Sequence, residues 1–80
     1  MGRGVLMFLS DLKIGDSAEI TEISVSESDR QRLLNLGIAV GTKIEALYKS
    51  PFGNPKAYLA RGTVFALRNE TAAKITVEKI

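Results

Sequence analysis

Carboxylates are the side chains of this sequence best suited to acid–base or metal chemistry. The chain has nine acidic residues but no histidine and no cysteine, so it lacks the commonest general base, the commonest zinc ligand and every thiolate. No stretch has the alternating oxygen ligands of a calcium-binding loop. We interpret Asp11 and Asp16, and likewise Glu27 and Asp29, as helix caps and solvated charges.

The hydroxyl groups and glycines do not complete a reactive motif either. Ser24, Ser26 and Ser28 cluster, but the sequence has no histidine, and no lysine lies near them to act as a base. A phosphate-binding loop needs glycines and a lysine at the start of a helix, whereas the glycines here fall at a predicted helix end and between strands. We therefore assign no catalytic residue, no cofactor-binding residue and no metal ligand, and we expect a protein that is not an enzyme.

Binding through surface side chains is the chemistry that remains. Arg30 and Arg32 lie two residues apart on a predicted helix and point to different faces, so one faces solvent, either to meet an acidic partner or simply to be solvated. Phe52 stands between two prolines, where it either covers the end of the fold or anchors a partner. We take Arg30, Arg32, Phe52 and the neighbouring Asn54 as candidate partner-binding residues.

The two tyrosines raise a second mode of binding. Tyr48 and Tyr58 could stack a proline-rich peptide, but that mode needs an aromatic-lined groove. The chain has two tyrosines, three phenylalanines and no tryptophan. We therefore expect both tyrosines to pack in the core.

The arginines lie on a helix that we predict over residues 27–36, with Leu33, Leu34 and the methylenes of Arg30 on its inner face. Ser26 with Asp29, or Ser28 with Gln31, offers a capping pattern at its start.

Gly37 ends this helix, because a residue in the left-handed region just past a helix costs least as glycine. Ile38 is then expected to fold back onto Leu33.

Alternation of apolar and polar residues indicates strands in much of the remaining chain. The predicted strands cover residues 18–25, 42–49, 56–61, 63–68 and 74–80. Their inward residues include Ile44, Ala46 and Tyr48, and then Ile75, Val77 and Ile80. The connecting segments are a helical turn at 9–12, a loop at 50–55 and a turn or short helix at 69–73. The alternation breaks between Ile20 and Ile23, which predicts a bulge, and Gly62 is interpreted as a bulge or a close backbone approach.

Five short strands and one inserted short helix in 80 residues predict a mainly β fold, a small and partly open barrel whose closure hides the sheet edges. Residues 9–80 form this single domain, and residues 1–8 are a lead-in of start-site or flexible sequence. An edge that stays open could pair with a second copy of the chain, and we expect that edge at residues 42–49.

Charge and hydropathy limit the partners. The net charge of +2 and the sequence pI of about 9.2 come from residues spread along the chain without a basic block, which does not favour nucleic-acid binding. The apolar run Val5–Leu9 is too short to span a bilayer. We expect a cytoplasmic protein that neither binds nucleic acid nor inserts into a membrane.

Taken in order, the residues resemble the FeoA family, small cytoplasmic proteins of bacterial ferrous iron uptake with an SH3-like barrel. The match runs nearly end to end. Its residues are Leu9, Ser10, Asp11, Leu12, Gly15, Arg32, Leu33, Leu36, Gly37, Ile38, Gly41, Thr42, Pro51, Gly53, Pro55, Arg61, Gly62, Ala66, Leu67, Arg68, Glu70, Ala72, Ile75 and Val77.

The resemblance implies an accessory protein that binds the cytosolic GTP-binding part of the membrane transporter FeoB and affects iron uptake or nucleotide turnover. The GTPase would supply the phosphate chemistry, and this chain would offer a docking face, with no iron ligand of its own, at the inner face of the membrane. We expect that face to combine the helix at 27–36 with the loop at 50–55.

Two alternatives stay open. One is a generic SH3-like interaction or RNA-binding barrel, and the other is a severed C-terminal domain of an iron-dependent repressor, although the chain has no DNA-binding helix pair. Salt separates RNA binding from docking, because a backbone-dominated nucleic-acid complex weakens steeply with salt and an apolar docking face does not.

Overall fold

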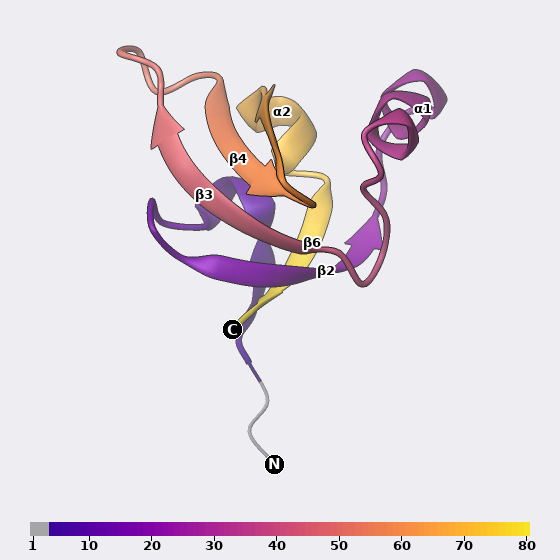
Figure 1. Ribbon diagram of the computed structural model, residues 1–80, viewed down its shortest axis with the longest axis horizontal. Coiled ribbons are helices and arrows are strands. Elements are labelled where there is room, and N and C mark those ends of the chain that lie inside the picture. The colour runs from indigo at the N-terminus through magenta and orange to yellow at the C-terminus, as the bar shows by residue number, and fades with distance from the viewer. Residues whose placement is uncertain (1–3) are drawn as a thin grey trace.

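Antiparallel strands form one strongly curved sheet in the computed structural model, which describes residues 4–80 (Figure 1). The elements in chain order are β1 (Leu6–Phe8), the 3-10 turn η1 (Leu9–Asp11), β2 (Ser17–Ile23), α1 (Glu27–Asn35), β3 (Lys43–Lys49), β4 (Lys56–Ala60), β5 (Thr63–Leu67), α2 (Asn69–Ala72) and β6 (Ile75–Lys79). The strand order across the sheet is β1-β6-β2-β3-β4-β5. The prediction of a mainly β fold with one inserted helix at 27–36 is confirmed.

The sheet has six strands within residues 4–80, one more than expected from the sequence. The additional strand is β1, which lies in the segment that we assigned to a lead-in. Met7 pairs with Val77 of β6, and the Lys79 amide donates to the Val5 carbonyl at 2.8 Å. Three residues are too few to show an alternating pattern, so the sequence carried no strand signal there. Residues 1–3 of the predicted lead-in lie outside the described residues.

The core fills the concave side of the sheet. Its buried members are Leu9, Leu12, Ala18, Ile20, Leu33, Ile38, Ile44, Ala46, Tyr58, Ala60, Phe65, Leu67, Ala72, Ile75 and Val77. Inward placement is confirmed for Ile44, Ala46, Ile75, Val77 and Tyr58.

Two predicted core residues are exposed instead. Tyr48 keeps 60% of its surface exposed, because the β3–β4 register shifts between Ala46 and Tyr48 and turns the end of the strand outward. Ile80 follows the last strand residue and is 67% exposed. Both predictions assumed that side chains alternate between the two faces of the sheet up to the end of the segment. The alternation stops earlier, at the register shift in β3 and at the end of β6.

Two local irregularities of the strands were predicted from the sequence. The predicted bulge in β2 is confirmed, since the register with β6 shifts between Ile20 and Glu22. The interpretation of Gly62 as a bulge or a close backbone approach is wrong. No atom lies within 4 Å of a Cβ placed there, and β4 and β5 are joined by a two-residue turn in which Arg61 and Gly62 have φ of 53° and 76°. Positive φ at both positions is the type I′ geometry that suits a twisted hairpin.

Strand β3 is not an edge. It pairs with β2 on one side and β4 on the other, so the expectation of an open edge at residues 42–49 is wrong, and self-association through a strand edge stays a prediction. The outer strands are β1 and β5. In the part of the chain that the structure describes, no helix is long and apolar enough to span a lipid bilayer.

Candidate functional site

The start of α1 is set by a serine cap. Ser26 Oγ accepts from the Asp29 amide at 3.4 Å, which selects the first of the two predicted capping patterns. Thr71 of α2 donates to Asp29 Oδ2 at 3.5 Å, so the first turn of α1 also contacts α2. The helix ends one residue before the predicted end.

The end of α1 is set by Gly37, whose φ is +80°. The Gly37 amide donates to the Leu34 carbonyl and the Ile38 amide to the Leu33 carbonyl, both at 2.9 Å. This capping geometry turns the chain back, and Ile38 enters the core together with Leu33. The predicted cap is therefore confirmed. Arg61 lies against it, since a Cβ at position 37 would stand 3.4 Å from Arg61 Cδ.

A tight turn follows the cap and leads into β3. Thr42, which is only 6% exposed, accepts from the Ala39 amide through Oγ1 at 3.0 Å. The Thr42 amide in turn donates to the Ala39 carbonyl at 3.0 Å, and the Gly41 amide donates to the Ile20 carbonyl at 2.7 Å. The turn is thus tied to β2, and it leaves Val40 at its tip with 63% of its surface exposed.

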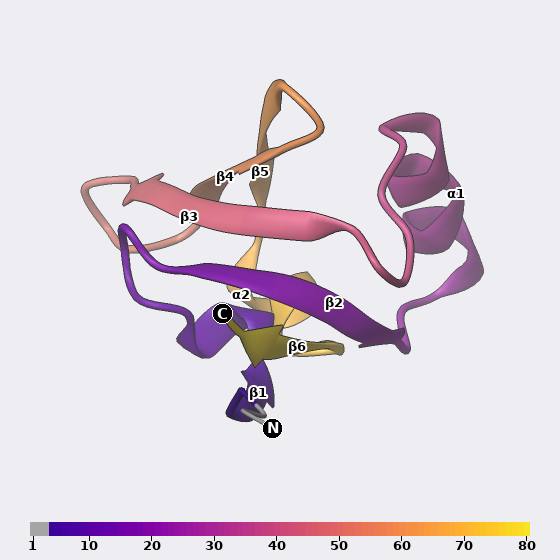
Figure 2. The same cartoon turned by 60° about the horizontal axis from the view of Figure 1, so that its bottom comes forward.

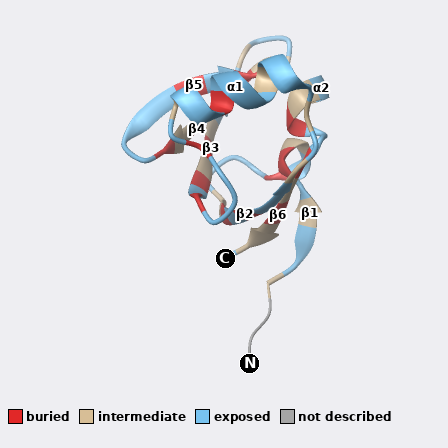
Figure 3. Cartoon of the chain, turned by 90° about the vertical axis from the view of Figure 1, so that its right-hand side faces the viewer, coloured by how far each residue is buried: buried red, intermediate tan, exposed pale blue. Residues whose placement is uncertain are grey.

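Between α1 and this turn lies an apolar depression of about 310 Å³, which we call the α1 groove. Its lining residues are Ile23, Arg30, Leu33, Leu34, Ile38, Ala39 and Val40. Leu34 on the helix is 52% exposed and faces solvent, as does Val40 on the turn. Figure 3 shows α1 exposed along most of its length, and Figure 2 shows it standing away from the strands. The groove therefore presents apolar side chains that the fold itself does not cover.

The two candidate arginines differ in their surroundings. Arg30 lines the groove, and its Nη2 donates to the Ile23 carbonyl at 3.1 Å, which holds the guanidinium at one end of it. Arg32 lies outside the groove and pairs with Asp29 at 3.9 Å, with 63% of its side chain exposed. An exposed pair of this kind contributes little to stability, so the Arg32 charge stays available to solvent and partners.

Phe52 and Asn54 lie on the β3–β4 loop. Phe52 is 95% exposed, so the interpretation that it covers the end of the fold is wrong. Asn54 is engaged within the fold: its Oδ1 accepts from the Asn69 amide at 2.9 Å and its Nδ2 donates to Glu70 Oε1 at 3.3 Å. Hydrogen bonds from the backbone amide of Glu70 and from Asn54 lower the pKa of the Glu70 carboxyl. Asn54 thus fastens the loop to α2.

The helix and the loop do not form one face. Figures 1 and 2 place α1 and the β3–β4 loop at opposite ends of the molecule, whose longest extent is 35 Å. The prediction that Leu34 lies with Leu33 on the inner face of the helix is wrong, because Leu33 alone is buried and Leu34 is exposed beside the groove; Val40 was not singled out from the sequence. The signal for Val40 was an apolar residue in a glycine-bounded turn, but only the fold shows that it lines the same groove as Leu34.

Among residues 4–80, no three acidic, histidine or cysteine side chains gather closely enough to hold a metal ion.

Comparison with known proteins places this geometry in a family. The model of the FeoA domain matches residues 7–79. A curated relative from Porphyromonas gingivalis (strain ATCC BAA-308 / W83), the Fe(2+) transport protein A/Fe(2+) transporter FeoB fusion protein, is 36% identical over 74 residues. The match covers 92% of this chain and only 9% of that much longer protein.

Solved structures agree with the sequence match. The solution structure of the FeoA protein from Chlorobium tepidum has a TM-score of 0.88 at 36% identity, covering 92% of this chain and 70% of that one. The zinc complex of Stenotrophomonas maltophilia FeoA, described as a prokaryotic SH3 domain protein, has a TM-score of 0.76 at 29% identity, covering 90% and 89%. The fold is thus SH3-like, and the chain belongs to the FeoA domain family, associated with ferrous iron transport.

Proposed function

We propose that this chain is a non-enzymatic accessory protein that binds the cytosolic GTP-binding part of the ferrous iron transporter FeoB and regulates it. In this proposal the chain acts in the cytoplasm, at the inner face of the membrane, and docks through the α1 groove.

The observation that carries the proposal is the fusion in Porphyromonas gingivalis, where a domain like this chain and the transporter share one polypeptide. Joining two binding modules makes their contact intramolecular, with an effective concentration in the millimolar range for a short flexible linker. A domain that meets its partner without such a link needs a docking surface that binds by itself.

The α1 groove has the chemistry of such a surface. An apolar centre with a few charges at its rim is typical of protein interfaces, and here the groove offers the exposed apolar side chains of Leu34 and Val40 together with the charge of Arg30. These groups suit an apolar side chain of the partner flanked by a carboxylate. Arg32, on the exposed part of α1, would extend the charged rim.

The test is a titration of the chain with the cytosolic GTP-binding domain of its cognate transporter, loaded with GDP or with a non-hydrolysable GTP analogue. We expect Leu34→Glu to weaken binding at least tenfold, because it places a charge in the apolar centre. Phe52→Glu is the matched control at the other end of the molecule, and we expect it to change the affinity less than twofold. Circular dichroism verifies that both variants are folded.

The possible outcomes distinguish the two candidate docking faces and test the proposed partner domain. Loss of binding in Phe52→Glu but not in Leu34→Glu would move the docking face to the β3–β4 loop. Equal affinity of all three chains would reject both faces, and absence of binding by the wild-type chain would reject the proposed partner domain. Different affinities for the GDP and GTP-analogue forms, with a changed rate of GTP hydrolysis, are the expected signature of regulation.

A further inference from the structure

Lys56, the first residue of β4, is a buried cation outside the α1 groove. It is only 8% exposed, and its Nζ donates to the carbonyls of Ser10 at 3.0 Å and Leu12 at 2.8 Å. The ring of Tyr58 lies 5.8 Å from Nζ. Within residues 4–80 no carboxylate lies within ion-pair distance of this ammonium. An ammonium has three N–H donors, so one remains for a further acceptor.

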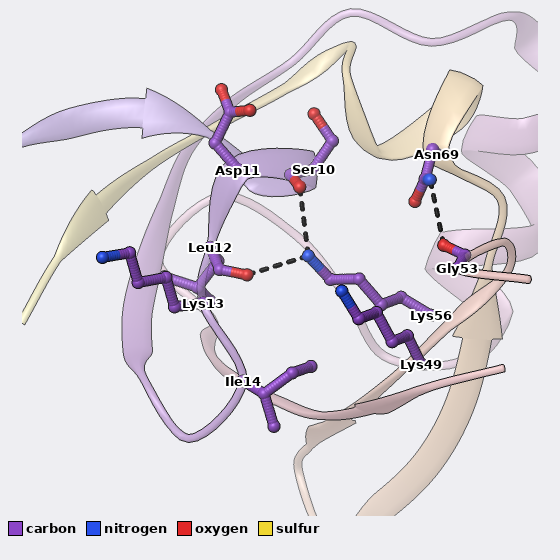
Figure 4. A pocket seen from close by; sticks show the side chains of 9 residues that line it. All are labelled: Ser10, Asp11, Leu12, Lys13, Ile14, Lys49, Gly53, Lys56 and Asn69. Atoms are coloured by element: carbon purple, nitrogen blue, oxygen red, sulfur yellow. Dashed lines mark hydrogen bonds between the residues drawn. The ribbon is translucent and has the colours of Figure 1, made fainter. Parts of the chain in front are cut away.

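This ammonium faces a pocket of about 330 Å³, shown in Figure 4. The pocket lies between η1, with the segment that follows it, and the β3–β4 loop. Its lining residues are Ser10, Asp11, Leu12, Lys13, Ile14, Lys49, Gly53, Lys56 and Asn69. Figure 4 shows the Lys49 side chain beside that of Lys56, while the Asp11 carboxylate points away from both.

The fold itself brings the two lysines together. Lys49 and Lys56 are direct cross-strand partners of β3 and β4, and like charges at such positions repel each other. Burial, and next the charge of Lys49, lower the pKa of Lys56, while Asp11 acts in the opposite direction. Three lysines against one aspartate give the pocket lining a net positive charge of two.

We propose that this pocket binds a small doubly charged oxyanion of the phosphate class. Its oxygens accept the third N–H of Lys56 and the N–H donors of Lys49, and its two negative charges relieve the repulsion between these cations. Lys13 lies at the rim and contributes long-range attraction. Charge-assisted hydrogen bonds between ammonium groups and phosphate oxygens are among the stronger polar contacts in proteins.

The experiment is a titration of the chain with inorganic phosphate at constant ionic strength, followed by backbone amide NMR and by the thermal midpoint. We expect saturable shifts at the lining residues and a midpoint that rises with phosphate concentration. Lys49→Gln is expected to weaken phosphate affinity about tenfold or more, because it removes one charged donor. Lys43→Gln is the matched control: Lys43 is exposed, lies on the same strand and does not line the pocket, so the affinity should not change.

Three outcomes would overturn the proposal. Shifts that grow linearly with phosphate, or that sodium chloride reproduces, would mean an adventitious ion only. Equal weakening by Lys49→Gln and Lys43→Gln would mean a diffuse response to net charge. Binding to phosphatidylglycerol vesicles that depends on Lys49, together with no response to free phosphate, would assign the pocket to lipid headgroups instead. None of these results depends on the transporter.

Discussion

Tyr58 shows how a single residue can serve the fold while leaving one of its own polar groups unsatisfied. It is fully buried, its ring centroid lies 6.1 Å from that of Phe65, and its hydroxyl has no hydrogen-bond partner within residues 4–80. The aromatic ring therefore contributes through burial and packing. The hydroxyl, by contrast, costs free energy, because a buried polar group without a partner has lost its hydration.

Burial raises the pKa of Tyr58 from 10.0 to about 12. The folded state thus keeps the phenol proton at a pH where the unfolded chain has lost it, so the stability is complete below pH 10 and declines between pH 10 and about 12. Two pKa units correspond to a loss of about 3 kcal/mol in the free energy of unfolding.

We predict that Tyr58→Phe removes most of this alkaline loss and leaves stability at pH 7 unchanged or slightly higher. Urea denaturation of both chains at a series of pH values measures it, with the exposed Tyr48→Phe as control. An alkaline loss that persists undiminished in Tyr58→Phe would contradict the prediction.

At the scale of elements, α1 depends on its two ends more than on its length. A helix of nine residues is marginal by itself in water, and Leu33 is its only buried residue. The Ser26 cap, the Gly37 cap and the return of Ile38 to the core therefore determine where the helix stands. The position of the α1 groove depends on the same residues, because the turn that carries Val40 follows Gly37 directly.

We predict that Gly37→Ala lowers the free energy of unfolding by about 1–2 kcal/mol, because a residue with a Cβ is disfavoured at a φ of +80°. A Cβ at this position would meet Arg61 at an ordinary van der Waals distance of 3.4 Å, so the cost comes from the backbone conformation. Gly37→Asn should lose less, since asparagine tolerates the left-handed region. Urea denaturation gives the values, and Gln31→Ala on the exposed side of α1 serves as a control. Equal stability of Gly37→Ala and wild type would show that the cap is not strained by a side chain.

At the scale of the whole molecule, the sheet holds together through pairings that are distant in sequence. Strand β1 pairs with β6, which also pairs with β2, so the first and last strands lie side by side at one edge of the sheet. Met7 of β1 packs against the core from this position. The family match from residue 7 onward agrees with β1 belonging to the fold.

We predict that deletion of residues 1–8 lowers the free energy of unfolding by about 2–3 kcal/mol, through the lost burial of the partly buried Met7 together with the lost pairing of β1 with β6. Met7→Ala in the full chain separates the side chain from the strand pairing and should lose part of that amount. Denaturation together with amide hydrogen exchange in β6 measures both. Unchanged stability and protection after the deletion would restore the assignment of residues 1–8 to a lead-in.

The sequence by itself determined the features that depend on residues close together along the chain. The period of two indicated five strands, the break between Ile20 and Ile23 indicated the bulge, and the serine and glycine at the ends of α1 indicated its limits. The ordered residues also indicated the family. These features are local, because φ preference, capping and side-chain alternation involve residues only a few positions apart.

Only the tertiary structure decided the features that depend on contacts between segments far apart in the sequence. A register shift against β4 exposes Tyr48, the two neighbours of β3 remove it from the edge, and the curvature of the sheet separates α1 from the loop that carries Phe52. The placement of Leu34 and Val40 along one groove, and the hydrogen bonds of Lys56 to the carbonyls of Ser10 and Leu12, have the same origin. A pattern along the chain states which way a side chain points within its own element, but the group it faces is set by long-range contacts, which no local preference encodes.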